Sequence, residues 1–391
     1  MKRFLASEFP LALTFGLAAI AVGACTAPGG GGGTKDTGAF VPSTDLGVTL
    51  DLVTDTPAAP PDAGPATKTP IWSVDPAAPT SAAGKKVQHF GGYGAAGDER
   101  LYLCGDAGLF RVRRGGTWED RDVGGTAAVR GCHALDDDRM IAVADGGKAW
   151  LWSKAGAQWT PNEILDGPAL RAAWMLGDQE AIAVGAAGSL YRLSGATWTP
   201  ETTAGVTGTL EALWGTPDAS FLVAVGDQVI ATYDSKTAAW KKEPLPADPD
   251  GTPDAQKGFH GLAVAGVAKN NVWAVGDWGR ILYRGVDGTW THQDGQWSVT
   301  AFTAVTAFSP QDVMIVAKKG QVRRFDGAKW NVVDVQSPKK LPDGGAWPSP
   351  DARIDGQTVR SYDLVGVWGS GPGALWLIDG AAHLIQYNGR W

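Results

Sequence analysis

Short apolar runs separated by turn residues dominate the chain from about residue 87 to its end. Two adjacent runs, Val272-Trp273-Ala274-Val275 and Ile281-Leu282-Tyr283, are joined by a turn of the form Gly-Asp-x-Gly. Such turns are typical of β-hairpins, because glycine and aspartate tolerate the backbone conformations that tight turns require. No long stretch repeats with a helical period, so the pattern predicts an all-β protein built from short antiparallel strands.

The runs recur as seven similar units that each end in a tryptophan. The clearest units are VWAVGDWGRILYRGVDGTW (272–290), LYLCGDAGLFRVRRGGTW (101–118) and LWLIDGAAHLIQYNGRW (375–391). Four of the six intervals between the tryptophans are 39–42 residues, the length of one four-stranded propeller blade. We therefore predict a seven-bladed β-propeller whose blades are packed together by these residues. They are Trp118, Trp159, Trp198, Trp240, Trp290, Trp330 and Trp391.

The last unit stops at Trp391, where its outermost strand should begin. Residues 71–74, Ile-Trp-Ser-Val, have the composition of that missing strand. We predict that this N-terminal strand pairs with the third strand of the last unit and closes the ring. The propeller domain is therefore expected to cover residues 71–391.

The repeat at 270–290, with the pattern N-x-V-W-A-V-G-D-x-G-x-I-L-x-x-x-x-x-G-x-W, resembles bacterial β-propeller lipoproteins of the WD/YVTN/BNR-like superfamily. The resemblance covers about residues 71–391 and implies the propeller fold, which supports many unrelated functions. Sialidase-type members carry complete Asp-boxes and an Arg triad. This chain has only partial matches to the Asp-box, such as Asp287-Gly288-Thr289-Trp290, and it lacks a Phe-Arg-Ile-Pro motif.

The N-terminus resembles a bacterial lipoprotein signal. A basic start at Lys2 and Arg3 precedes an apolar run from Leu11 to Val22, which is short for a permanent membrane span. The run leads into Val22-Gly23-Ala24-Cys25, a pattern similar to the lipobox in which the cysteine accepts lipid. We expect residues 1–24 to be a cleaved signal peptide and residues 25–70 to comprise the lipidated Cys25 and a flexible tether. The alternative is an ordinary secretory signal beside a chance cysteine.

The net charge of the chain limits the classes of molecule that it is expected to bind. Removal of Lys2, Arg3 and Glu8 with the signal takes the formal net charge from −7 to −8, and no basic stripe is present. An acidic chain gains little from nucleic-acid phosphates, so we expect no nucleic-acid partner.

Cys104 and Cys132 are the two cysteines that remain beyond Cys25. Export would place them in an oxidising compartment, where a disulfide between them is a reasonable expectation. The alternative is a pair of small buried thiols that pack as apolar side chains.

The candidate binding surface is one face of the propeller. In a four-stranded blade, the turn between the second and third strands emerges on the same side as the connection to the next blade. The two longest connections, 243–259 and 335–361, should therefore lie on the face that carries the Gly-Asp turns. Aromatic and arginine side chains there are typical of interfaces. The candidate residues are Asp106, Asp277, Trp278, Lys339, Lys340, Trp347, Arg353, Asp355 and Arg360. The alternative is that these loops only plug the channel.

Few residues suggest catalysis or metal binding. The five histidines form no H-x-H or H-E-x-x-H pair, and His133 replaces the tryptophan found at its position in other repeats. The aspartates of the Gly-Asp turns are explained by turn chemistry, although a ring of carboxylates around the channel mouth could bind a cation. We predict no cofactor, no metal site and no catalytic residue.

These observations favour a monomeric, non-enzymatic interaction module at the outer membrane, on its periplasmic face or on the cell surface, which binds an envelope protein or glycan. The alternative is a hydrolase or lyase that acts on glycans. Two or more carboxylates clustered with arginine at the channel mouth would favour the enzyme, whereas an aromatic surface built by loops would favour the binding module.

Overall fold

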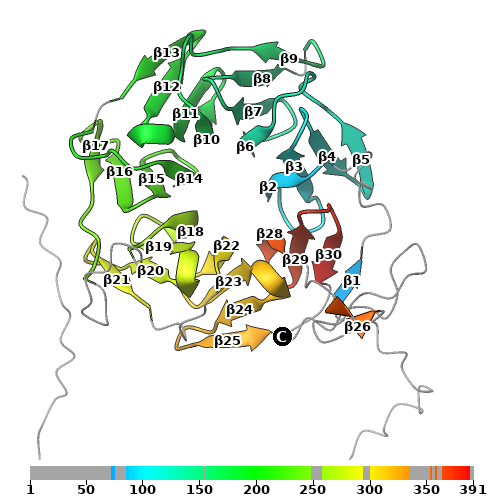
Figure 1. Ribbon diagram of the computed structural model, residues 1–391, viewed down its shortest axis with the longest axis vertical. Helices are drawn as coiled ribbons and strands as arrows, with labels where there is room; N and C mark the ends of the chain where they lie inside the picture. The colour runs from blue at the N-terminus through cyan, green and yellow to red at the C-terminus, as the bar shows by residue number, and fades with distance from the viewer. Residues whose placement is uncertain are drawn as a thin grey trace, which may run out of the picture. The chain divides into compact units, whose positions relative to one another are not determined.

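The computed structural model describes residues 72–74, 85–153, 155–201, 203–247, 258–293, 300–333, 353–354, 357–358 and 363–387. These residues form seven four-stranded antiparallel sheets, together with a two-stranded hairpin of β26 (Arg353–Ile354) and β27 (Gln357–Thr358). The sheets are arranged in a ring (Figure 1), and the predicted seven-bladed β-propeller is confirmed.

The strands of each blade follow the order of the sequence from the axis outward. The innermost strands are β2 (Val87–Tyr93), β6 (Val129–Ala134), β10 (Leu170–Gly177), β14 (Leu210–Gly215), β18 (Gly261–Ala268), β22 (Phe302–Ser309) and β28 (Leu364–Gly371). The second strands are β3 (Arg100–Gly105), β7 (Arg139–Ala144), β11 (Glu180–Gly185), β15 (Phe221–Gly226), β19 (Asn271–Gly276), β23 (Asp312–Ala317) and β29 (Ala374–Asp379).

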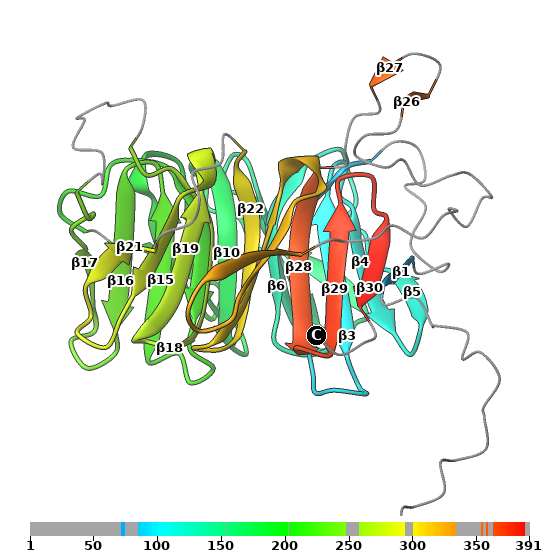
Figure 2. The same ribbon diagram turned by 90° about the horizontal axis from the view of Figure 1, so that it is seen from below.

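The third strands are β4 (Phe110–Arg114), β8 (Ala149–Ser153), β12 (Leu190–Ser194), β16 (Val229–Asp234), β20 (Ile281–Arg284), β24 (Val322–Phe325) and β30 (Leu384–Tyr387). The outermost strands are β5 (Thr117–Asp120), β9 (Gln158–Pro161), β13 (Thr197–Pro200), β17 (Ala239–Lys242), β21 (Trp290–His292), β25 (Trp330–Val333) and β1 (Trp72–Val74). Figure 2 shows the strands running side by side between the two faces of the ring.

The ring closes through the N-terminal strand, as predicted. β1 pairs antiparallel with β30, with Trp72 opposite Tyr387 and Val74 opposite Ile385. The innermost strand β28 also contacts β2 of the first blade. One blade therefore combines strands from the two ends of the domain, so neither end can leave without exposing a sheet edge.

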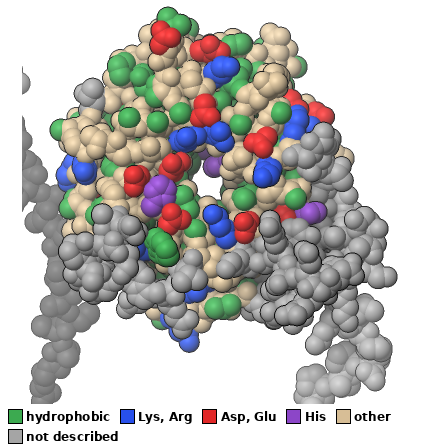
Figure 3. Space-filling view, viewed as in Figure 1, with side chains coloured by type: hydrophobic (Ala, Val, Ile, Leu, Met, Phe, Trp, Pro, Cys, Tyr) green, Lys and Arg blue, Asp and Glu red, His purple; other side chains and the backbone are tan. Residues whose placement is uncertain are grey.

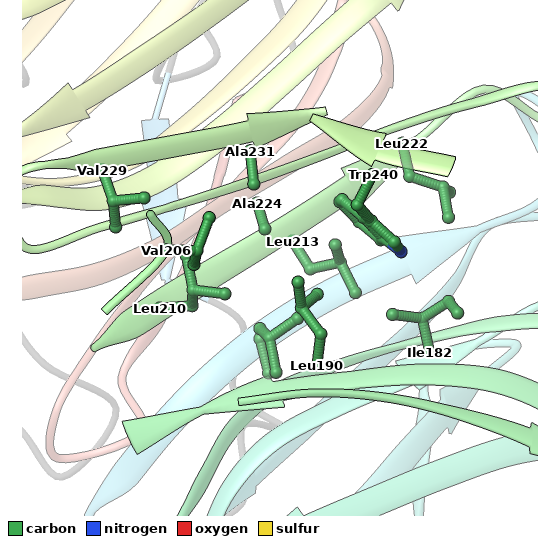
Figure 4. Packing of buried hydrophobic residues seen from close by; sticks show 12 residues of the cluster. Ile182, Leu190, Val206, Leu210, Leu213, Leu222, Ala224, Val229, Ala231 and Trp240 are labelled. Carbon is green, nitrogen blue, oxygen red and sulfur yellow. The ribbon is translucent and has the colours of Figure 1, made fainter. Parts of the chain in front are cut away.

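The hydrophobic core lies between the blades. Every residue of β15 is buried, and the other second strands are buried along most of their length. A second strand has a neighbouring blade on each of its faces, so its residues are apolar at almost every position. Figure 4 shows one such layer, in which Ile182 and Leu190 from one blade meet Leu213, Leu222 and Trp240 from the next.

The repeated tryptophans connect successive blades through hydrogen bonds as well as packing. The indole N–H of Trp159 donates to the carbonyl of Arg121, and that of Trp198 donates to the carbonyl of Asn162. In both cases the acceptor residue directly follows the outermost strand of the preceding blade. Trp240 and Trp330 make the same kind of contact with the side chains of Glu201 and Gln293. The predicted blade-packing role is therefore correct for these four residues. Trp391 lies outside the described residues.

Within the described residues, no helix is long and apolar enough to cross a membrane. The predicted signal peptide (residues 1–24), Cys25 and the predicted tether (residues 25–70) lie outside the part of the chain that the structure describes.

Candidate functional site

The innermost strands enclose a central channel. The cavity has a volume of about 550 Å³, and every innermost strand contributes to its wall. It opens on the face that carries the turns between second and third strands, which we call the loop-bearing face. Figure 3 views this face and shows basic, acidic and histidine side chains around a central opening. The volume lies in the range of about 300–1,000 Å³ that is typical of small-molecule pockets.

The second residue of an innermost strand lies at the rim of this channel in several blades. Arg130 donates from Nε and Nη2 to one oxygen of Asp145, at 3.1 and 2.9 Å. Arg171 donates from Nη1 to the other oxygen at 3.0 Å, and its Nε lies 4.0 Å from a carboxylate oxygen of Glu211. Gln88 makes an equivalent contact in the first blade, where its amide donates to Asp106 at 3.0 Å. Charge-assisted hydrogen bonds therefore join the rims of the second and third blades, and an ion pair extends this chain of charges to the fourth blade.

The rim continues into a sector with more acidic side chains on the fourth and fifth blades. Backbone contacts join its members: Asp227 and His260 form a β-bridge, and the Asp277 amide donates to the carbonyl of His260 at 3.1 Å. Nδ1 of His260 lies 3.5 Å from a carboxylate oxygen of Asp227. Trp278, which follows Asp277, is therefore next to this sector on the loop-bearing face.

Trp278 occupies an unusual backbone position for a tryptophan. Its φ is +59° and half of its surface is exposed. The corresponding turn residue is Ala107 in the first blade and Ala187 in the third, both also with positive φ. A bulky side chain is rare in the left-handed conformation, which costs about 1–2 kcal/mol. The fifth blade therefore places a large exposed aromatic group where the first and third blades have alanine.

His133 lines the channel below the rim. The register confirms that it lies opposite Ile141 as Trp174 lies opposite Ile182, so it takes the tryptophan position of its repeat. Its ring stacks on Trp174 at 3.9 Å, and it is 9% exposed. The Met175 amide donates to Nδ1 at 3.1 Å, so the ring proton is on Nε2. Burial lowers the pKa of His133 to about 3, and the imidazole is neutral at neutral pH.

The lower part of the channel is lined by tryptophan side chains that pack against glycines of the next blade. Trp174 lies against Gly215, and Trp368 lies against Gly92. A Cβ atom at Gly92 would lie 2.5 Å from the Trp368 ring, so only glycine fits there. Trp214 lies against a glycine of the fifth blade in the same way. The inner tryptophans therefore pack each of these blades against the next.

A disulfide joins Cys104 and Cys132, whose Cα atoms are 6.4 Å apart. Cys104 belongs to β3 and Cys132 to β6, so the bond fastens the first blade to the second. Both residues are almost fully buried, and Cys132 lines the channel one position before His133.

The carboxylates of the Gly-Asp turns are used in different ways. Asp379 is buried and accepts from the backbone amides of Ala381 and His383, which is turn chemistry. Asp145 and Asp106 are held by the rim contacts described above. Among the described residues, no group of three His, Cys, Asp or Glu side chains could hold a metal ion.

The structure places only part of the predicted binding surface. Asp106, Asp277 and Trp278 belong to turns of the loop-bearing face. For Arg353 the structure gives only a place in the backbone of β26, so the second long connection contains a short hairpin as well as loop. The remaining candidates lie outside the described residues: Lys339, Lys340, Trp347, Asp355 and Arg360.

Sequence reasoning missed Arg130, Arg171 and Glu211 at the rim. Each directly follows the apolar residue that begins an innermost strand and is the unpaired residue of a β-bulge, an irregularity that redirects a side chain. An alignment of the seven units at this position would have revealed the signal.

Known structures share the fold of this chain at low sequence identity. YCF48 bound to a D1 peptide aligns with a TM-score of 0.58 and 16% identity, over 85% of this chain and 99% of YCF48. A streptogramin B lyase aligns with a TM-score of 0.62 and 11% identity, over 81% and 96% of the two chains. A catalytically inactive virginiamycin B lyase from Staphylococcus aureus with quinupristin gives 0.58 and 10%, over 78% and 96%. No family model and no curated protein matches the chain.

Proposed function

We propose that this protein is an exported lipoprotein, anchored to the outer membrane through Cys25, whose propeller binds a segment of an envelope protein on its loop-bearing face. The propeller acts as a binding scaffold without a catalytic role. The tether of residues 25–70 holds the propeller away from the lipid surface.

The observation that carries the binding proposal is the conformation of Trp278. Its indole is half exposed although its backbone lies in the left-handed region, which is unfavourable for a bulky side chain. Ala187 shows that the fold accepts a small side chain at the same turn position. Exposed tryptophans are frequent energetic anchors of protein interfaces. A partner that covers the indole would account for a tryptophan at this position.

Two further observations support the same face. Asp277 lies beside Trp278, so the apolar anchor has a polar border of the kind that surrounds protein interfaces. In addition, the structural neighbour YCF48 has been solved with a bound peptide, which shows that this architecture can hold one.

The export proposal rests on the N-terminal sequence and is supported by the disulfide. Disulfides persist in oxidising compartments and are rare in the cytosol of mesophilic cells. The bond between Cys104 and Cys132 is therefore compatible with the signal peptide expected at residues 1–24.

The alternative is an enzyme that acts on glycans, and one observation favours it. Asp145 and Glu211 meet Arg130 and Arg171 at the channel mouth, which is the kind of cluster expected of an enzyme. However, both oxygens of Asp145 accept hydrogen bonds from arginine, so this carboxylate is engaged in holding the guanidinium groups. Among the described residues that line the channel, Glu211 is the one carboxylate. The arrangement therefore favours binding over acid–base catalysis by a carboxylate pair.

Replacement of Trp278 by glycine tests the binding face. Trp278→Gly removes the anchor and also relieves the left-handed backbone, which offsets the loss of the half-buried indole at least in part, so the variant should fold as the wild type does. Ala187→Gly makes the same backbone change in another blade and serves as the control. In pull-downs from envelope extract, wild type and Ala187→Gly should capture the same partner, and Trp278→Gly should lose it.

Equal capture by the Trp278→Gly variant would reject the choice of anchor. A second variant, Trp347→Ala with Arg353→Ala, tests the contribution of the long connection. Capture should be abolished, and undiminished capture would exclude that part of the face from the binding site.

Membrane anchoring has a separate test. Cys25→Ala should prevent incorporation of labelled palmitate and should move the protein from the membrane fraction to the soluble fraction. Retention of the label in the variant would refute lipidation at Cys25. Protease treatment of intact cells would then distinguish the cell surface, where the propeller is cut, from the periplasm, where it is protected.

A further inference from the structure

The central channel has three layers of different chemistry along the innermost strands. At the loop-bearing face lie Arg130, Arg171 and Glu211. Below them the wall consists of small or aliphatic side chains: Cys132, Ala172, Ala173, Leu213, Val264, Val305 and Val367. The third layer holds His133 and Trp174, three residues after Arg130 and Arg171 respectively. Since a strand rises about 3.3 Å per residue and Arg130 and Arg171 each lie in a β-bulge, the first and third layers are about 7–10 Å apart.

The two arginines of the upper layer share a hydrogen-bond acceptor that lies outside the channel wall. The carboxylate of Asp145 accepts hydrogen bonds from Nε and Nη2 of Arg130 and from Nη1 of Arg171. Asp145 itself is not part of the channel wall. Nη1 of Arg130 and Nη2 of Arg171 make no hydrogen bond to any of the described residues, and both side chains line the channel. Two guanidinium groups fixed by a shared carboxylate form a pre-organised site for an oxyanion, because little side-chain entropy is lost on binding.

The histidine of the lower layer offers a further donor. Nδ1 of His133 accepts from the Met175 amide, which leaves the proton on Nε2. Nε2 has no hydrogen-bond partner among the described residues, although His133 is more than nine-tenths buried and lines the channel. Nε2 is accessible from the channel, so an acceptor atom of a ligand at this depth can take its hydrogen bond.

We propose that the channel binds a small elongated carboxylate with an apolar body and a hydroxyl or carbonyl oxygen about 7–10 Å from its carboxylate. The carboxylate lies between Arg130 and Arg171, the apolar body lies against the aliphatic layer, and the distal oxygen accepts from Nε2 of His133. The cavity of about 550 Å³ suits a molecule of this size. The neutral state of His133, whose pKa burial lowers, supports its role as a donor.

Charge chemistry favours a carboxylate over an amine. Of the charged side chains that line the channel, two are arginines and one is a glutamate, and Glu211 already lies 4.0 Å from Arg171. An ammonium group at this position would face both guanidinium groups, and like charges at close range are strongly unfavourable. This proposal does not rest on the binding face of Trp278.

The probe for the site is 3-(4-hydroxyphenyl)propionate, whose carboxylate and hydroxyl lie at opposite ends of an apolar body. Calorimetric titration of the full chain should show binding of this acid at least tenfold tighter than binding of its amide and of the corresponding amine. Arg171→Gln and Arg130→Gln should each weaken binding by about tenfold or more. Arg192→Gln is the matched control, because Arg192 is equally exposed and also paired with a carboxylate, but it lies outside the channel wall.

A double comparison locates the other end of the ligand. Removal of the probe's hydroxyl, in 3-phenylpropionate, should weaken binding to the wild type by about fivefold or more. The same removal should have no effect on His133→Phe, which lacks the donor. Arg171→Lys provides a charge-retaining variant in case Arg171→Gln unfolds, and thermal unfolding checks the fold of each variant.

Several results would overturn the assignment. They are equal binding of the acid and the amine, equal weakening by the Arg171 and Arg192 variants, and no binding of the acid to the wild type at concentrations up to about 10 mM. Trp278→Gly should bind the probe as the wild type does. Loss of partner capture with intact probe binding, or the reverse, therefore separates this site from the proposed protein-binding face.

Discussion

Removal of the disulfide between Cys104 and Cys132 tests how the first two blades are held together. The bond joins β3 of the first blade to β6 of the second, at a sequence separation of 28 residues. We expect the double variant Cys104→Ala, Cys132→Ala to fold as a propeller, because the apolar contacts between these blades remain. Its free energy of unfolding should nevertheless fall.

The loss follows from the entropy of the unfolded chain. A crosslink that closes a loop of this length removes entropy from the denatured state, which amounts to about 3.6 kcal/mol at 25 °C. A propeller of about 300 residues has an unfolding entropy of about 0.6 kcal/mol per degree at its midpoint, so this loss lowers Tm by about 5–6 °C. The two sulfur atoms are buried and their removal leaves small cavities, so the measured loss should be no smaller than this value.

The assay is thermal unfolding of wild type and variant, each with and without a reducing agent. The reducing agent should lower the Tm of the wild type toward that of the double variant and should leave the double variant unchanged. The double variant therefore serves as the control for direct effects of the reducing agent. Hydrogen exchange should show that added mobility begins at the contact between the first and second blades.

Equal Tm values for oxidised and reduced wild type, with complete reduction verified by thiol labelling, would refute the argument. Such a result would mean that apolar packing between the two blades alone sets the stability of the propeller.

Two further predictions concern the channel. Because burial lowers the pKa of His133 to about 3 and that of His89 to about 4, only the unfolded chain binds these two protons between about pH 6.5 and pH 4; the free energy of unfolding should fall by about 4 kcal/mol from pH 7 to pH 5, and urea titrations should find about half of that fall in His133→Gln. Gly92→Ala should destabilise the protein by about 1–3 kcal/mol, since its Cβ would lie 2.5 Å from the Trp368 ring, whereas Gly371→Ala, whose Cβ meets no atom within 4 Å, should cost no more than about 0.5 kcal/mol in the same assay.

Local sequence signals predicted the fold because every blade carries its own copy of them. The Gly-Asp turn and the terminal tryptophan recur along the chain at the spacing of the blades. A unit that matches the pattern poorly can therefore be assigned by comparison with the other units. Residues 71–74 could be assigned to the last blade because that unit visibly lacks an outer strand, and β1 is found there. His133 was recognised as a channel or core residue from its place in the repeat, which the register confirms.

The site was predictable only in part, because it combines residues from different blades. The predicted face includes Asp106, Asp277 and Trp278, which belong to the repeated turn and therefore stand out in the sequence. Arg130 and Arg171 do not belong to the repeated motif, and each appears in the sequence as an ordinary charged residue at a strand end.

The sequence by itself determined the all-β class, the number of blades, the closure of the ring and the side on which the turns emerge. These properties depend on the order of apolar and turn residues, which is local information. Only the tertiary structure decided that Asp145 holds Arg130 and Arg171 together, that Cys104 meets Cys132, and which imidazole nitrogen of His133 carries the proton. Each of these depends on distances between separate blades or strands, and such distances are fixed only when the sheets pack around the axis.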